Sequence, residues 1–179
     1  HVEQCDGLED KVPSLADPDR QPFSPIERCE EIVSGIPQRP AIRHGGRQAF
    51  YRPAADSITM PDRELFDSPP EYYSCLFHEL THSTGHASRI GRPGIENLSP
   101  FGSPTYSREE LVAEMGAAYL CGEARIEQAT IENSAAYLRG WIAKLRGDLS
   151  LAVKAAGAAQ RAADYILDRQ PASTERVAA

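Results

Sequence analysis

Apolar residues recur at helical spacing through the segment "DSPPEYYSCLFHELTHSTG", residues 67–85. Tyr72, Leu76 and Leu80 lie four positions apart, so on a helix they share one face. A Ser-Pro pair followed by a glutamate marks the start of this segment, and a glycine permits its end. The pattern predicts a helix over residues 69–84.

The same start signal occurs near the beginning of the chain. Ser24, Pro25 and Glu27 have the spacing of a capping box with proline in the first turn, and Gly35 can end the helix. A helix over residues 25–34 is therefore expected. Later helices are predicted from Ser107 onward, over about 133–145 and over the alanine-rich stretch 148–168.

Two short segments between the first two helices favour strands. "RQAFYRP" and "DSITMP" are rich in β-prone residues that alternate with polar ones, and the turn-like "PAAD" separates them. They predict a small antiparallel pair. Residues 87–106 are rich in glycine, proline and serine, and a loop of this length in a compact domain is typical of a lid or binding loop. The expected fold class is α+β, a small antiparallel sheet with several helices.

Length and composition narrow the class of protein. A chain of 179 residues suits one domain, and its 41% hydrophobic and 25% charged residues are typical of a soluble globular protein. The net charge of −7 argues against a broad nucleic-acid footprint. The four cysteines are scattered, with no Cys-x-x-Cys pair and no secretory signal, which predicts reduced thiols in a cytoplasmic protein.

The helix over 69–84 carries the candidate chemistry. His78 and His82 are four residues apart and can present their rings to one ion, with Glu79 beside them. This is the H-E-x-x-H spacing of zinc hydrolases, in which the ion activates a water and the glutamate acts as general base. The competing interpretation is a surface helix whose histidines and glutamate are merely solvated.

A third metal ligand is required, and three residues are candidates. His86 follows Gly85, where the helix is expected to end. The metzincin pattern would instead place a histidine where Ser88 stands, so that class is disfavoured. Glu110 and Glu114 lie four apart in "EELVAE". We favour Glu110 as the ligand and Glu114 as the residue that orients a histidine, with the reverse left open.

Other roles for these residues also stay open. Glu110 has capping-box spacing from Ser107, which is a purely structural role. His86 could face the substrate, as could Tyr106, and Tyr51 and Arg89 are further polar groups that could stabilise an oxyanion. Each of these four is more often an ordinary packing or surface residue.

Three blocks together resemble the metallopeptidase domain of the ArdC-type antirestriction proteins of plasmids and phages: "YYSCLFHELTHSTGHASRI", "FGSPTYSREELVAEMGAAYL" and "NSAAYLRGWIAKL". The resemblance implies a zincin-like α+β domain, a divalent metal at His78, His82 and a downstream glutamate, and Glu79 as general base. It also implies a preceding domain that binds single-stranded DNA. Residues 1–23 are then expected to be an extended linker, 24–170 the metallopeptidase domain and 171–179 a polar tail.

The expected function is hydrolysis of peptide bonds in a protein target, with Zn²⁺ as the cofactor or Mn²⁺ in its place, in an antirestriction or mobile-element setting. "DSITM" is the candidate edge strand for the substrate. One alternative is a metal-stabilised binding module with little cleavage. Another is a single-stranded-DNA accessory domain. In that case phosphate contacts and base stacking would come from side chains of residues 38–52: Arg39, Arg43, His44, Arg47, Phe50, Tyr51 and Arg52.

Overall fold

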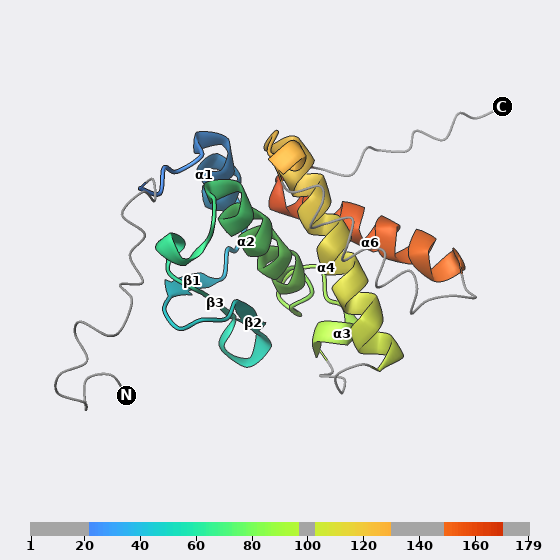
Figure 1. Cartoon of the computed structure of the whole chain (residues 1–179). Helices are drawn as coiled ribbons and strands as arrows, with labels where there is room; N and C mark the ends of the chain where they lie inside the picture. The colour runs from blue at the N-terminus through green and yellow to red at the C-terminus, as the bar shows by residue number, and fades with distance from the viewer. Residues whose placement is uncertain (1–21, 97–102, 130–148, 170–179) are drawn as a thin grey trace.

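The computed structural model describes residues 22–96, 103–129 and 149–169, and they form an α+β arrangement (Figure 1). The central element is helix α2, Pro69–Ser83, which contacts a three-stranded sheet and also helix α4, Pro104–Glu123. Helix α6, Leu149–Ile166, packs against α4 and α2. The α+β class is confirmed, and the expected helix over 133–145 lies outside the described residues.

Helix α2 forms where the apolar pattern predicted it. The side chain of Ser68 accepts a hydrogen bond from the backbone N–H of Glu71, which satisfies one of the free donors of the first turn. Tyr72, Leu76 and Leu80 are buried, as their shared face requires. Because both sides of this helix are covered, its polar residues near the C-terminal end are also largely buried.

The first helix begins later than predicted. Helix α1 spans Glu27–Ser34, and the residue before it, Ile26, is extended and packs against the core. No side chain caps this helix, so the expected capping box of Ser24 and Glu27 does not form. Partial burial of Ile26 against the core accompanies this later start.

The sheet contains one strand more than the sequence predicted. Strands β1, Ala41–His44, β2, Phe50–Arg52, and β3, Ser57–Met60, have the order β1-β3-β2. The antiparallel pairing of β2 with β3 confirms the prediction, and a 3-10 turn, Pro53–Ala55, joins them. Strand β1 pairs with β3 in parallel, so the sheet is mixed.

This pairing corrects the expected position of the substrate edge. The segment "DSITM" contains β3, which has a partner on each side and therefore cannot accept a further strand. Among the described strands, β2 is the edge that faces α2 and the candidate site. Strand β1 was missed because Ile42 is its one large apolar residue, too little for an alternating pattern.

The stretch predicted as a long loop is partly helical. It contains helix α3, Pro93–Glu96, and α4 begins at Pro104 instead of Ser107. Ser103 caps α4 by accepting a hydrogen bond from the Tyr106 N–H at 3.2 Å, while Ser107 is buried inside the helix. The capping-box role considered for Glu110 is therefore excluded, because Glu110 lies on the second turn of α4.

Small residues let α2, α4 and α6 approach closely. Gly116 of α4 faces Thr81 of α2, and alanines of α6 pack on Leu111 and Val112.

None of the described cysteines, Cys29, Cys75 and Cys121, forms a disulfide. Across the described ranges, every helix is too short or too polar to cross a bilayer.

A buried arginine joins the end of α2 to the sheet. The Arg89 side chain is 1% exposed, and its guanidinium forms an ion pair with Asp56. It also donates to the carbonyl oxygens of Ser83 and Gln38 and to the Tyr51 hydroxyl. Tyr51 in turn donates to Asp56 at 2.8 Å. These bonds fix β2 and the turn before β3 relative to the helix that carries the histidines.

Replacement of Gly116 by alanine tests the contact between α2 and α4. A Cβ at this position would lie 2.5 Å from Cγ2 of Thr81, whereas one at Gly122 of the same helix would meet nothing within 4 Å. We expect Gly116→Ala to lower the free energy of unfolding by about 1–3 kcal/mol. Gly122→Ala should leave it unchanged or raise it by up to about 1 kcal/mol. Equal stability of the two variants in urea denaturation would contradict the contact.

The ion pair of Asp56 predicts a pH dependence of stability. Hydrogen bonds from Arg89, helped by Tyr51 and opposed by partial burial, lower the pKa of Asp56. The ionised carboxylate therefore stabilises the fold above its unfolded pKa of about 3.9, and this contribution is lost as pH falls through the lower folded value. Asp56→Asn should be less stable than wild type by about 1–3 kcal/mol near neutral pH, and the difference should shrink in acid.

Denaturation curves at a series of pH values measure this difference. The exposed Asp62, which caps no helix through its side chain, provides the control variant Asp62→Asn. A difference between wild type and Asp56→Asn that stays constant down to strongly acidic pH would argue against the ion pair.

Candidate metal centre

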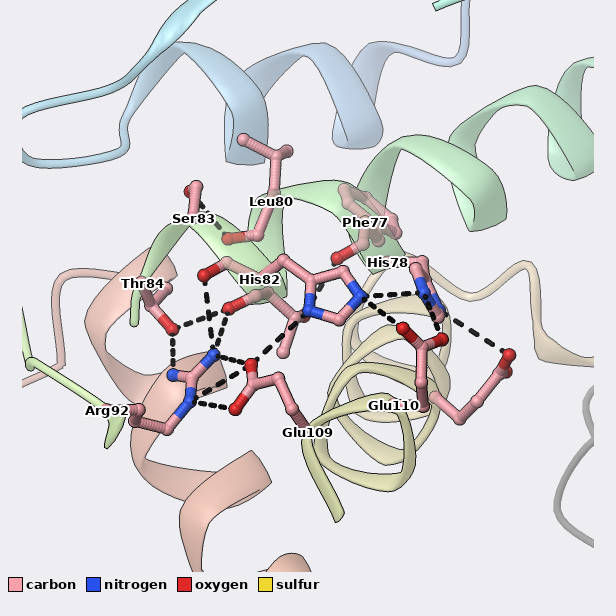
Figure 2. A network of polar contacts seen from close by, with 11 residues as sticks. Phe77, His78, Leu80, His82, Ser83, Thr84, Arg92, Glu109 and Glu110 are labelled. Carbon is pink, nitrogen blue, oxygen red and sulfur yellow. Dashed lines mark hydrogen bonds and ion pairs between the residues drawn. The ribbon is translucent and has the colours of Figure 1, made fainter. Parts of the chain in front are cut away.

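Two imidazole rings converge at the C-terminal half of α2. His78 and His82 lie one turn apart, with ring centroids 4.7 Å from each other and Nε2 atoms 3.1 Å apart. Figure 2 shows both rings directed toward α4. Helical geometry alone brings the two residues to one face, and burial between α2 and α4 restricts where the rings can point.

Helix α4 supplies a carboxylate to the same point. Glu110 places one oxygen 3.6 Å from Nε2 of His78 and the other 3.6 Å from Nε2 of His82. One donor atom from each of these three residues lies within 4.8 Å of the others. Ligand atoms about 2.0–2.1 Å from a tetrahedral ion are separated by about 3.3 Å, close to the 3.1 and 3.6 Å spacings found here.

Each histidine also has a carboxylate at its other ring nitrogen. Nδ1 of His78 lies 3.5 Å from Glu114, and Nδ1 of His82 lies 3.3 Å from Glu109. A proton held on Nδ1 by such a carboxylate leaves the lone pair of Nε2 free to bind an ion. At these positions the two outer carboxylates, Glu109 and Glu114, can orient the rings and favour the tautomer that a metal site requires.

An arginine holds one of these outer carboxylates in place. Arg92 contacts both oxygens of Glu109 at 2.6–3.2 Å and donates to the hydroxyl of Thr84 and the carbonyl oxygen of Thr81 (Figure 2). Arg92 and Glu109 are both buried. Burial raises the pKa of Glu109, but His82 and Arg92 outweigh it and lower that pKa, so Glu109 is an ionised acceptor.

The remaining charges around the histidines are negative. Burial lowers the pKa of His78, but Glu110, Glu79 and Glu114 outweigh it and raise that pKa. Burial, together with the nearby Glu110 and Glu79, raises the pKa of Glu114. Four glutamates thus surround two imidazoles and one arginine. A divalent cation would offset most of this excess of negative charge, so the donor set fits a metal by charge as well as by spacing.

Glu79 faces a cavity next to the three candidate ligands. Its side chain is 8% exposed, and the cavity has a volume of about 380 Å³. Strand β2, α2, α3 and α4 all contribute to the lining, including Phe50 and Tyr106. A carboxylate beside the ion and open to a cavity is the arrangement that a general base needs.

The other predicted residues fall in different places. Tyr106 lines the cavity near Glu110, and burial followed by that carboxylate raises the pKa of its hydroxyl to about 12. His86 does not line this cavity; its Nδ1 bonds the Ser88 hydroxyl at 2.8 Å. The side chains of Tyr51 and Arg89 both bond to Asp56; Tyr51 also contributes to the cavity lining, whereas Arg89 does not.

Sequence reasoning missed Glu109 and Arg92. Glu109 directly precedes the favoured ligand, and a helix places successive residues about 100° apart, so Glu109 can reach Nδ1 of His82 while Glu110 faces the Nε2 atoms of both histidines. That signal was available in "EEL". Arg92 gave no signal, because it lies in the stretch predicted as a loop and its partners come from two helices.

The fold and the three candidate ligands indicate a metal-binding domain, and comparison with known protein families points to the same class. Residues 27–158 match the family described as zincin-like metallopeptidase. The chain belongs to this family. The family and the arrangement of His78, His82 and Glu110 together support metal binding at this site.

Solved structures give a more specific likeness, to an antirestriction ArdC protein of plasmid R388. Its Mn(II)-bound structure matches with a TM-score of 0.60 and 34% identity, over 93% of this chain and 59% of that one. The metal-free structure matches with a TM-score of 0.55 and 29% identity, over 91% and 60%. The resemblance to ArdC-type proteins seen in the sequence is confirmed.

Curated relatives are longer proteins. A DNA primase TraC of Escherichia coli is 39% identical over 92% of this chain but only 11% of its own length. An uncharacterized protein y4eC of Sinorhizobium fredii is 34% identical over 81% of this chain and 46% of its own. The chain thus spans a tenth to about half of these relatives, and corresponds to one part of each.

The different positions of Glu110 and Glu114 predict different effects on metal content. Glu110 approaches both Nε2 atoms, whereas Glu114 approaches Nδ1 of His78. Glu110→Gln should lose stoichiometric metal, as should His78→Ala and His82→Ala. Glu114→Gln should keep one ion but bind it about 10- to 100-fold more weakly.

Elemental analysis after dialysis and a competition titration with a chelator measure the two effects. Exposed Glu64, outside the cavity, provides the control Glu64→Gln. Full metal content in Glu110→Gln with loss in Glu114→Gln would reverse the two roles.

Proposed function

We propose that this domain is a metal-dependent peptidase that hydrolyses peptide bonds of a protein target. The observation that carries the proposal is the convergence of His78, His82 and Glu110 on one point beside Glu79, which faces the cavity. A purely structural metal site does not need a carboxylate that is free to act as a base. The family membership supports the same reaction class.

His78, His82 and Glu110 would hold the ion. A divalent ion at this position supplies Lewis acidity, which lowers the pKa of a water toward neutrality and polarises a carbonyl oxygen. Two imidazole nitrogens and a carboxylate are ligands that suit Zn²⁺, and Mn²⁺ accepts them also. We infer Zn²⁺ as the ion, with Mn²⁺ as the alternative, since the similar ArdC structure is Mn(II)-bound.

The protein's own groups then have separate tasks. Glu79 accepts a proton from the attacking water while the oxygen of that water forms a bond to the carbonyl carbon. Glu79 then delivers the proton to the amine nitrogen as the C–N bond breaks. Glu109 and Glu114 keep the two imidazoles in the tautomer and orientation that the ion needs. Tyr106 lies in the cavity wall, where its protonated hydroxyl can donate to the developing oxyanion.

The wider role follows from the relatives by analogy. We propose an antirestriction or mobile-element setting, because the similar solved protein is an antirestriction protein of a plasmid. The target is a protein whose extended segment lies along β2, the described edge strand beside the cavity. We propose that any contact with single-stranded DNA is made outside this domain, as the resemblance noted in the sequence implies.

Replacement of Glu79 separates catalysis from metal binding. Glu79→Gln keeps the size of the side chain but cannot accept a proton, and Glu79 is not among the three candidate ligands. We expect full metal content and a fall in casein cleavage of about 100- to 10,000-fold. Cleavage is measured with the metal-loaded wild type, Glu79→Gln and the control Glu64→Gln.

Two results would contradict the proposal. Equal cleavage by wild type and Glu79→Gln would remove the general base from the mechanism. Metal-loaded wild type that cleaves neither casein nor a panel of unfolded proteins would favour a metal-stabilised binding module.

A further inference from the structure

The face of the sheet that turns away from α2 is exposed and carries arginines. Strand alternation directs Ile42, Tyr51 and Ile58 toward the core, where they pack against the main cluster. The opposite face presents Arg43 of β1 and both Phe50 and Arg52 of β2, all exposed. We call these three residues the arginine face.

The charge of this region is opposite to that of the whole chain. Residues 38–60 contain four arginines and one acidic residue, Asp56, in a protein of net charge −7. Asp56 already pairs with Arg89. Arg43, Arg52 and the two nearby arginines, Arg39 and Arg47, make no ion pair within the described part of the chain, so their charges are available to a ligand.

The arginine face is continuous with the candidate active site. Phe50 is 37% exposed and also contributes to the rim of the cavity that contains Glu79. The guanidinium of Arg52 lies 5.2 Å from the centroid of the Phe50 ring, which holds one positive charge at that rim. Arg52 follows Phe50 two residues along β2, and Arg43 lies level with Phe50 on the other side of β3, so both arginines flank the point where a segment would leave the cavity past Phe50.

We propose that the arginine face binds an acidic stretch of the protein substrate that flanks the bond to be cleaved. This inference rests on the proposed peptidase function and adds a substrate class to it: extended polypeptides with aspartate or glutamate beside the cleavage site. Main-chain pairing along β2 would give affinity without regard to sequence, and the arginines would give selectivity for acidic side chains.

A peptide fits this surface better than a nucleic acid does. The strands are three or four residues long, so the face extends roughly 10–13 Å along them. Proteins that bind single strands without sequence preference stack successive bases on aromatic rings, and an OB fold covers about 4–16 nucleotides, whereas the arginine face offers one ring, Phe50. The acidic remainder of the protein also repels a long polyanion more than a short acidic peptide.

Binding of labelled peptides to the metal-loaded Glu79→Gln protein tests the proposal without cleavage. One peptide has an apolar centre flanked by glutamates, and its counterpart has glutamines in their place. We expect the glutamate peptide to bind roughly fivefold more tightly at low salt. The preference should fall to nearly none in the variant with Arg43→Gln and Arg52→Gln, and at high salt.

Arg161→Gln is the matched control, because Arg161 is exposed on α6, away from the sheet. It should retain the preference. Equal binding of the two peptides would overturn the proposal, as would the same loss in Arg161→Gln. Tighter, Arg43- and Arg52-dependent binding of an oligothymidine would assign the face to nucleic acid and overturn it too.

The outcomes for the two proposals are distinguishable. Casein cleavage with equal binding of both peptides would leave the peptidase function intact and remove only the acidic preference. Selective binding of the glutamate peptide with no cleavage of any protein would leave the arginine face as a docking surface and contradict the peptidase function.

Discussion

The close approach of α2 to α4 is the constraint on which the candidate metal centre depends. The histidines come from α2, and the three carboxylates nearest to them come from α4, so the nitrogen–oxygen distances of 3.3–3.6 Å follow from the spacing of the two helices. These carboxylates are Glu109, Glu110 and Glu114. Gly116 sets that spacing, because no side chain fits between its Cα and Thr81. Thr81 is also fixed from both ends, since its hydroxyl donates to Phe77 and its carbonyl oxygen accepts from Arg92.

The same contact explains how a cluster of four carboxylates is tolerated inside a small domain. Burying one ionised glutamate is costly unless it is paired. Glu109 has Arg92 and His82, and Glu110 and Glu114 share His78. Burial raises the pKa of Glu110, but His78 and His82 outweigh it and lower that pKa. Burial also raises the pKa of Glu114, and the opposing effect of His78 is too small to reverse the shift. The cluster therefore keeps an excess of negative charge, most of which a divalent ion at His78, His82 and Glu110 would offset.

How much of the fold and of the candidate site could be predicted from the sequence depends on how far apart in the chain the interacting residues lie. The helix at 69–83 and its two histidines follow from local spacing, and Glu110 and Glu114 follow from the next apolar helix. Strand β1 is set by its partner β3, and the later start of α1 accompanies partial burial of Ile26, so neither has a local signal strong enough to find it. The Arg92–Glu109–His82 chain joins three segments, and its members are recognisable only once those segments are side by side.

Two arginines with buried side chains therefore support different parts of the site. Arg92 holds a carboxylate behind one histidine and so acts on the ligands. Arg89 joins the carbonyl oxygen of Ser83, just after His82, to Asp56 and Tyr51, and so acts on the cavity wall formed by β2. Both lie in the stretch between α2 and α4 that looked like a loop. That stretch is thus part of the framework: it determines where β2, and any chain paired with it, lies relative to Glu79.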